Sequence, residues 1–63
     1  MKSDLVDIEV ELIHATEKAW LITADGDKKI WIPKSRAELE RILGKRTYTL
    51  TLAENFAIEK ELL

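Results

Sequence analysis

Apolar and polar residues alternate near the start of the chain, over residues 4–14. The apolar positions are Val6, Ile8, Val10 and Leu12, and the positions between them carry Asp7, Glu9 and Glu11. Successive side chains of a β-strand point to opposite faces, so this pattern predicts a strand with one buried face and one face in water. The three carboxylates then form a regular row with a spacing of about 6.8 Å, twice the rise per residue.

Ile13 interrupts this alternation, because it would point to the wet face of the strand. Such a position indicates a bulge, a strand end or a contact with another subunit. His14 would close the inward row. The chain has no second histidine and no cysteine, so His14 lacks partners for a metal site or for nucleophilic catalysis. We interpret it as a boundary residue held by hydrogen bonds.

Two short apolar runs, residues 19–24 and 29–32, flank Asp25-Gly26-Asp27. Asp-Gly between apolar runs strongly indicates a β-hairpin, because glycine tolerates the positive φ of a tight turn. A calcium loop would need a further acidic ligand downstream, so we interpret the aspartates as turn residues. Each run contains one tryptophan, Trp20 or Trp31. A core this small buries two indole N–H groups with difficulty, so we expect one tryptophan at a cleft or a subunit interface.

The segment after the hairpin predicts a short helix. Pro33 ends the strand, and Ser35-Arg-Ala-Glu38 matches a capping box. Leu39, Ile42 and Leu43 then recur with helical spacing before Gly44, which suits a helix C-terminus. An ordered loop that keeps only its last helical turn is the alternative.

Residues 47–52 alternate again and predict another strand. Tyr48, Leu50 and Leu52 would face inward, and Thr47, Thr49 and Thr51 outward. Thr51-Leu-Ala-Glu54 matches a second capping box and predicts a C-terminal helix. Its apolar face would hold Leu52, Ala53, Phe56, Ala57 and Leu63, with Ile58 and Leu62 on the opposite side. That second pair indicates either a contact with another copy or a frayed chain end.

Together these elements predict one α+β domain over residues 1–63. We expect a bent antiparallel sheet of about four strands, either a meander or a small open barrel of the SH3 or OB kind, with a short helix and a C-terminal helix. The chain has no cysteine for a disulfide and no cluster for a structural metal. Because so small a core gives little net stability, we expect self-association, most simply a dimer through Ile13, Ile58 and Leu62.

The net charge of −2 conceals an uneven distribution. Residues 1–27 carry seven acidic and two basic side chains (net −5), whereas residues 28–46 carry seven basic and two acidic ones (net +5). This distribution predicts either an ordinary solvated surface or two recognition faces of opposite sign. The acidic row of the first strand would imitate nucleic-acid phosphates, and a basic patch would bind a phosphate or an acidic partner. The patch residues are Lys28, Lys29, Lys34, Arg36, Arg41, Lys45 and Arg46.

Some classes of function are not expected. The sequence offers no nucleophile with its base, no glycine-rich phosphate loop and no metal cluster, so we expect neither enzymatic activity nor a cofactor. It contains no apolar run of about 18 residues, and its N-terminus does not have the form of a signal peptide. We therefore expect no membrane association and a cytoplasmic location, which the absence of cysteine also suits.

Three segments carry a resemblance to a known group. Lys18-Ala-Trp-Leu21, Trp31-Ile-Pro-Lys-Ser35 and Thr49-Leu-Thr-Leu52, followed by a short acidic helix, resemble a widespread group of small uncharacterised phage and prophage proteins. The chain departs from the usual pattern of proline at Ala53, tryptophan near Asn55 and glycine near Glu61. The resemblance implies a bacterial host cytoplasm, and it implies no particular chemistry.

Three functions from different classes remain. The first is a regulator that binds a host protein or protein complex, such as a defence inhibitor, through the acidic row and an exposed tryptophan. The second is a nucleic-acid-binding barrel that stacks bases on Trp31 or Tyr48. The third is an oligomer that sequesters a small anionic ligand. We predict the first, because the acidic first half of the chain repels phosphates.

Overall fold

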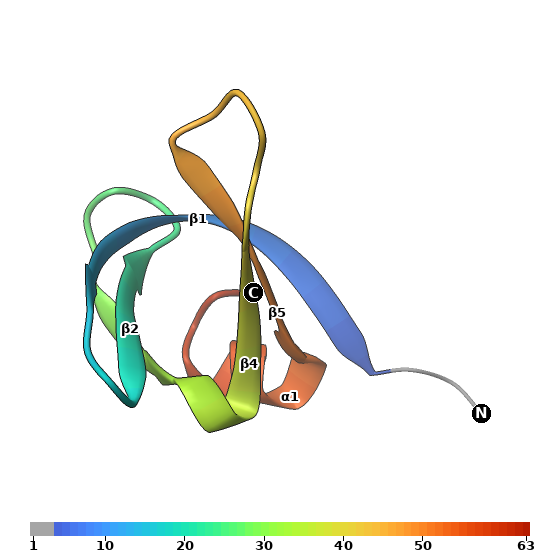
Figure 1. Cartoon of the computed structure of the whole chain (residues 1–63). Coiled ribbons are helices and arrows are strands. Elements are labelled where there is room, and N and C mark those ends of the chain that lie inside the picture. Colours follow the sequence, from blue (N-terminus) through green and yellow to red (C-terminus); the bar gives the residue numbers. More distant parts are fainter. Residues whose placement is uncertain (1–3) are drawn as a thin grey trace.

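The structure of the chain is a computed structural model that describes residues 4–63. Within these residues, five strands form one sheet and a short helix follows it (Figure 1). The elements are β1 (Leu5–Ala15), β2 (Ala19–Thr23), β3 (Ile30–Pro33), the 3-10 turn η1 (Lys34–Arg36), β4 (Ala37–Arg41), β5 (Thr47–Ala53) and α1 (Glu54–Glu59). Neighbouring strands are antiparallel in the order β3-β2-β1-β5-β4. The antiparallel sheet and the C-terminal helix are confirmed, but the sheet has five strands instead of about four.

The helix expected before the last strand is wrong, because residues 34–41 form η1 and the edge strand β4. Ala37 and Leu39 lie opposite Leu52 and Leu50 of β5 and pack against the core. The alternation of apolar and acidic residues in β4 therefore prevails over the capping-box signal, since a strand gains both a ladder to β5 and an inward Leu39. The N-cap residue of η1 is Pro33 instead of Ser35, and no side chain caps this turn.

The remaining residues of the expected helix form the connection between β4 and β5. Leu43, predicted to face the core, is 93% exposed in this connection. Gly44 has a φ of 79°, which glycine adopts without strain because it has no Cβ. This residue therefore forms part of a hairpin turn and does not end a helix.

β1 is the longest strand, and it joins the two halves of the sheet. Its first half pairs with β5 and its second half pairs with β2. The register shifts between Leu12 and His14, which makes Ile13 a bulge residue and confirms one of the expected explanations for it. His14 consequently pairs with Leu21 on the outer face, so its predicted place in the inward row is wrong.

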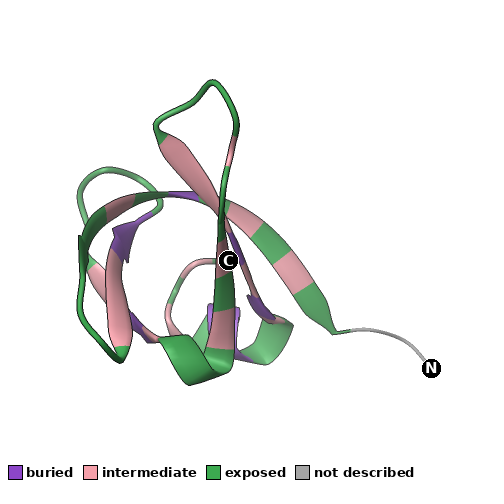
Figure 2. Cartoon of the chain, in the orientation of Figure 1, coloured by how far each residue is buried: buried purple, intermediate pink, exposed green. Residues whose placement is uncertain are grey.

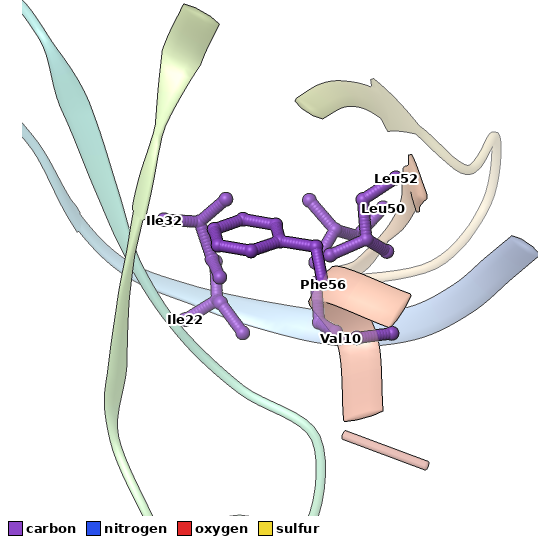
Figure 3. Close-up of a cluster of buried hydrophobic side chains, with 7 residues drawn as sticks. Val10, Ile22, Ile32, Leu50, Leu52 and Phe56 are labelled. Atoms are coloured by element: carbon purple, nitrogen blue, oxygen red, sulfur yellow. The ribbon is translucent and has the colours of Figure 1, made fainter. Parts of the chain in front are cut away.

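The core lies between the inner face of the curled sheet and α1. The buried apolar residues are Val10, Ile22, Ile32, Leu50, Leu52, Phe56 and Ala57. The phenyl ring of Phe56 projects from α1 and lies between Ile22 and Ile32 on one side and Leu50 and Leu52 on the other (Figure 3). Buried positions occur in the sheet and in α1, whereas the connections between strands are exposed except for the half-buried Ile42 (Figure 2). The inward rows expected for the first and last strands are confirmed with the exception of His14.

The chain reverses direction at the end of α1. The N–H of Leu62 donates to the carbonyl of Ala57 (2.8 Å) and the N–H of Glu61 to that of Ile58 (3.0 Å), which is a Schellman motif. The reversal turns Leu62 toward the core and leaves Leu63 exposed, opposite to the helical projection. The second capping box also does not form, because Ala53 is the N-cap residue and α1 begins at Glu54.

Glu61 occupies the left-handed position of this motif, with a φ of 61°. An L-residue is strained there and glycine is not, so the double variant Lys28→Met, Glu61→Gly should melt about 5 °C higher than Lys28→Met alone. Lys28→Met is the matched reference because it already removes the ion pair between Lys28 Nζ and Glu61 (2.7 Å). Thermal melts followed by circular dichroism measure the difference, and equal melting temperatures would contradict strain at Glu61.

Candidate functional site

On the solvent-facing side of the sheet, β1 and β4 carry acidic residues. β5 lies between these two strands and carries threonines. We call this surface the acidic face: Asp7, Glu9 and Glu11 from β1, Glu38 and Glu40 from β4, and Thr47, Thr49 and Thr51 from β5. The ladders align it in rungs. Asp7, Thr51 and Glu38 form one rung, and Glu9, Thr49 and Glu40 form the next.

Two threonine hydroxyls orient carboxylates of the acidic face. Thr51 Oγ1 donates to Asp7 Oδ1 at 2.6 Å, and Thr47 Oγ1 donates to Glu9 Oε2 at 2.7 Å. Both bonds are short, as is usual when a hydroxyl donates to an ionised carboxylate. Within residues 4–63, the only cation within 4 Å of these carboxylates is Lys45, whose Nζ is 3.8 Å from Glu9. The acidic face is therefore largely uncompensated.

A shallow groove of about 290 Å³ runs across the acidic face. Its lining consists of Asp7, Glu38, Leu39, Glu40, Thr49 and Thr51. Carboxylate and hydroxyl oxygens dominate this lining, so the groove offers hydrogen-bond acceptors and negative charge to a ligand. Its chemistry suits a cationic or guanidinium-bearing surface and repels anions.

The acidic row of β1 lies where the sequence predicted it, exposed on one face of a strand. Sequence reasoning missed Glu38 and Glu40, because it placed them on a helix among basic residues. The signal that could have found them is the strict alternation of Ala37-Glu38-Leu39-Glu40, which fits a strand as well as the helical spacing fits a helix.

The seven basic residues expected to form one patch occupy three places. Lys28 and Lys29 lie between β2 and β3, Lys34 and Arg36 lie on η1, and Arg41, Lys45 and Arg46 lie at the end of β4 and in the hairpin after it. η1 and this hairpin lie at opposite ends of β4 (Figure 1). The fold therefore separates the basic residues, which do not form one continuous patch.

Several basic side chains also have partners. Arg36 stacks over the ring of Phe56 with 4.3 Å between its guanidinium carbon and the ring centroid. Lys28 Nζ pairs with Glu61, and this hydrogen bond and charge lower the pKa of the Glu61 carboxyl. The first contact joins η1 to α1, and the second joins the β2–β3 connection to the chain end at the surface.

The exposed tryptophan is Trp31. It is 47% exposed on the outer face of β3, where its ring meets that of His14 edge to face with centroids 6.3 Å apart. Leu21 lies between them in register, so β3, β2 and β1 together present a row of two aromatic rings and one leucine. Trp20 packs against the core, with Lys34 Nζ 5.6 Å from its ring centroid. Tyr48 also packs against the core, which leaves Trp31 as the better placed of the two expected stacking residues.

The residues expected to contact another copy differ in exposure. Ile13 is exposed at the bulge of β1, and Ile58 is 57% exposed on α1. Leu62 packs partly against the core because of the chain reversal at Glu61. The exposed pair expected on the helix is therefore reduced to Ile58.

The connection between β2 and β3 is organised by Asp25. The N–H groups of Lys28 and Asp27 donate to Asp25 Oδ1, each at 2.9 Å, and lower the pKa of this carboxyl. Gly26 has a φ of 82°, as the Asp-Gly signal requires. The hairpin prediction and the assignment of these residues to turn formation are both confirmed.

Comparison of the chain with models of protein families, with curated proteins and with solved structures gives no match. No three or more acidic or histidine side chains in residues 4–63 are arranged to hold a metal ion. In the same residues, no helix has the length and apolar character needed to cross a membrane. The site is therefore interpreted from its own geometry.

Proposed function

We propose that this protein is a non-enzymatic binding domain whose acidic face engages the nucleic-acid-binding surface of another protein. The observation that carries the proposal is the arrangement of five carboxylates in two rows on one sheet face, with threonines between the rows. Proteins that bind nucleic acid present lysine and arginine to phosphates. A surface whose carboxylates are spaced like phosphates would compete with nucleic acid for the same lysine and arginine side chains.

The spacing of the two rows supports this proposal. Neighbouring carboxylates in one row stand about 6.8 Å apart, and the rows on β1 and β4 are separated by two strand spacings, about 9.6 Å. The first interval is comparable to that between successive phosphates of one strand, and two parallel rows imitate two backbones across a groove. The hydroxyl bonds to Asp7 and Glu9 hold part of this pattern in place before binding, which lowers the entropic cost of binding.

The resemblance to phage and prophage proteins supplies the biological setting of the proposal. In that setting the protein acts in the cytoplasm of a bacterial host as a phage accessory protein that modulates a host protein complex, such as a defence system. The curled five-stranded sheet, open between β3 and β4, is compatible with a small open barrel of the SH3 or OB kind.

One observation favours a second function. Trp31 is exposed beside His14 and could stack on an unpaired base of a nucleic acid. The separation of the basic residues into three places gives this alternative less support, since phosphate binding benefits from adjacent cations. Sequestration of a small anion has less support still, because carboxylates line the groove of the acidic face.

The proposal predicts that nucleic acid displaces the partner protein from the acidic face. The parent protein, immobilised and exposed to a bacterial lysate, should retain a nucleic-acid-binding protein, and added duplex DNA should release it. The variant Asp7→Lys, Glu9→Lys, Glu11→Lys should lose at least nine tenths of the retained protein, because repulsion replaces attraction along one whole row.

A matched control separates position from net charge. The variant Glu17→Lys, Asp27→Lys, Glu59→Lys changes the charge by the same amount at exposed positions outside the acidic face and should retain the partner. Circular dichroism verifies that both variants are folded. Equal retention by parent and β1 variant, or a partner that DNA does not displace, would refute the proposed use of the acidic face.

A further inference from the structure

Lys18 and Lys34 lie directly opposite each other, where β2 begins and β3 ends. Ala19 pairs with Pro33, so the next position outward sets Lys18 against Lys34. The N–H of Lys34 donates to the carbonyl of Lys18 at 2.8 Å, which continues the ladder to this pair. Opposite residues of an antiparallel ladder have Cβ atoms about 5 Å apart, and like charges at such positions are destabilising. The two ammonium groups therefore need either separation or a counter-charge.

The fold separates these two charges but gives them no counter-charge. Lys34 holds its ammonium group over the indole ring of Trp20, with 5.6 Å between Nζ and the ring centroid. Within residues 4–63, neither Lys18 nor Lys34 forms an ion pair with a carboxylate. Both side chains are exposed, so the two positive charges are available to a ligand from solution.

A hollow of about 430 Å³ lies at this pair. Its lining consists of Glu17, Lys18, Pro33, Lys34 and Ser35. The ring of Pro33 and the stems of the lysines provide apolar surface, and Ser35 provides a hydroxyl donor. Of these residues only Glu17 is acidic. The hollow therefore combines two ammonium groups, a hydroxyl group and an apolar surface within one small space.

Two further cations lie on the same side of the molecule. The guanidinium carbon of Arg36 is 4.3 Å from the centroid of the Phe56 ring, and Nζ of Lys60 is 5.6 Å from it. Arg36 is the residue after Ser35 on η1, so its charge adds to the positive potential at the hollow. In the part of the chain that the structure describes, neither cation forms an ion pair with a carboxylate. The potential around η1 thus lacks an internal counter-charge.

We infer that this hollow binds a phosphate group between Lys18 and Lys34. A phosphate monoester carries about −1.5 to −2 charges near neutral pH and so offsets both ammonium groups, whereas a carboxylate offsets only one. The Ser35 hydroxyl is a further donor for a phosphate oxygen. Inorganic phosphate and an organic monoester share this chemistry. The inference does not depend on the function proposed above, because none of these residues belongs to the acidic face.

Titration of the labelled parent protein with inorganic phosphate, followed by backbone amide signals in NMR spectra, tests the inference. At constant ionic strength, the signals of Lys18, Lys34 and Ser35 should move to saturation, with a dissociation constant in the millimolar range. Acetate should bind at least fivefold more weakly. Changes no larger than those with chloride, or acetate binding as tightly as phosphate, would overturn the inference.

Phenyl phosphate, titrated in the same way, distinguishes the two sources of the phosphate group. Its ring has the apolar surface of Pro33 to pack against, so tighter binding than that of inorganic phosphate would identify an organic monoester as the ligand. Equal or weaker binding would identify the phosphate ion itself.

Single-charge variants locate the site. Lys18→Gln and Lys34→Gln should each weaken phosphate binding at least fivefold, because each removes one of the two ammonium groups. Glu17→Gln should strengthen binding, since it removes the negative charge from the lining. Lys29→Gln is the matched control at the other end of β3 and should bind like the parent. Equal weakening by Lys29→Gln would show a dependence on net charge alone and reject the site.

The like-charge pair also predicts an effect on stability. In buffer without phosphate, Lys18→Gln should melt about 2 °C higher than the parent, because it removes the repulsion. Added phosphate should raise the melting temperature of the parent more than that of the variant, since a ligand stabilises the folded state to which it binds. A lower melting temperature for Lys18→Gln, or an equal rise of both proteins with phosphate, would contradict the inference.

Trp20 reports on Lys34 directly. In the variant Trp31→Phe, all tryptophan fluorescence comes from Trp20, whose ring faces the Lys34 ammonium group. Phosphate should draw this group away from the ring and change the emission intensity with the same midpoint as the NMR titration. Constant emission while the amide signals reach saturation would exclude Lys34 from the site and overturn the inference.

Discussion

Replacement of Phe56 by alanine is expected to remove about half of the free energy of unfolding of the protein. The phenyl ring is only 6% exposed and fills the space between the β2–β3 side of the sheet and β5 (Figure 3). Loss of a buried phenylalanine costs about 3–5 kcal/mol, through lost burial and the cavity left behind. The free energy of unfolding expected for 63 residues is about 3–9 kcal/mol, so one side chain accounts for a large part of it.

The same helix provides the control for this experiment. Ile58 is also large and apolar, but it is 57% exposed, so Ile58→Ala should change the free energy of unfolding by less than about 0.5 kcal/mol. Urea denaturation followed by circular dichroism measures both variants, with Phe56→Leu as an intermediate case. Similar losses for Phe56→Ala and Ile58→Ala would show that α1 does not close the core as described.

Phe56 also shows how far the sequence determines this fold. The helix after the last strand and the inward position of Phe56 and Ala57 were predictable from helical spacing, whereas Leu52 belongs to β5 and Leu63 is exposed. The stacking of Arg36 over the Phe56 ring was not, because it joins η1 to α1 across the open side of the sheet. Local patterns describe single elements, whereas this contact depends on how the whole sheet curls.

The bulge at Ile13 shows the limit of a strictly alternating pattern. The sequence located the irregularity, but it did not show that one extra residue moves His14 to the outer face. Because side chains in a strand have a period of two, a shift of one residue reverses the face of every position after it. The row formed by His14, Leu21 and Trp31 on the outer face is therefore a consequence of the bulge.

The acidic face was half predictable for a related reason. Asp7, Glu9 and Glu11 alternate along one strand and can be found without knowledge of its neighbours. The second row required that residues 37–41 form a strand and that this strand pair with β5. Helical and extended spacing both fit these residues, and the inward contacts of Leu39 with the core favour the strand.

Proline substitutions in β4 distinguish a strand from a helix over residues 37–41, through large changes in the free energy of unfolding. In the β4–β5 ladder, the N–H of Glu40 points toward β5 and the N–H of Arg41 points to the open edge, in register with the bond from Ile42 to Thr47. Glu40→Pro should cost about 3 kcal/mol, since it removes a ladder bond and places the proline ring against β5. Arg41→Pro should cost about 1 kcal/mol or less, because no ladder donor is lost.

The two positions are well matched, because both side chains are exposed and adjacent in one strand. A helix over the same residues would place positions 40 and 41 in its interior, where proline is unfavourable at either. Urea denaturation of the two variants thus distinguishes the structures through the difference between their free energies of unfolding. Equal, large losses would favour the helix and remove Glu38 and Glu40 from the acidic face. A large loss at Glu40 alone would establish β4 as the edge that carries the second acidic row.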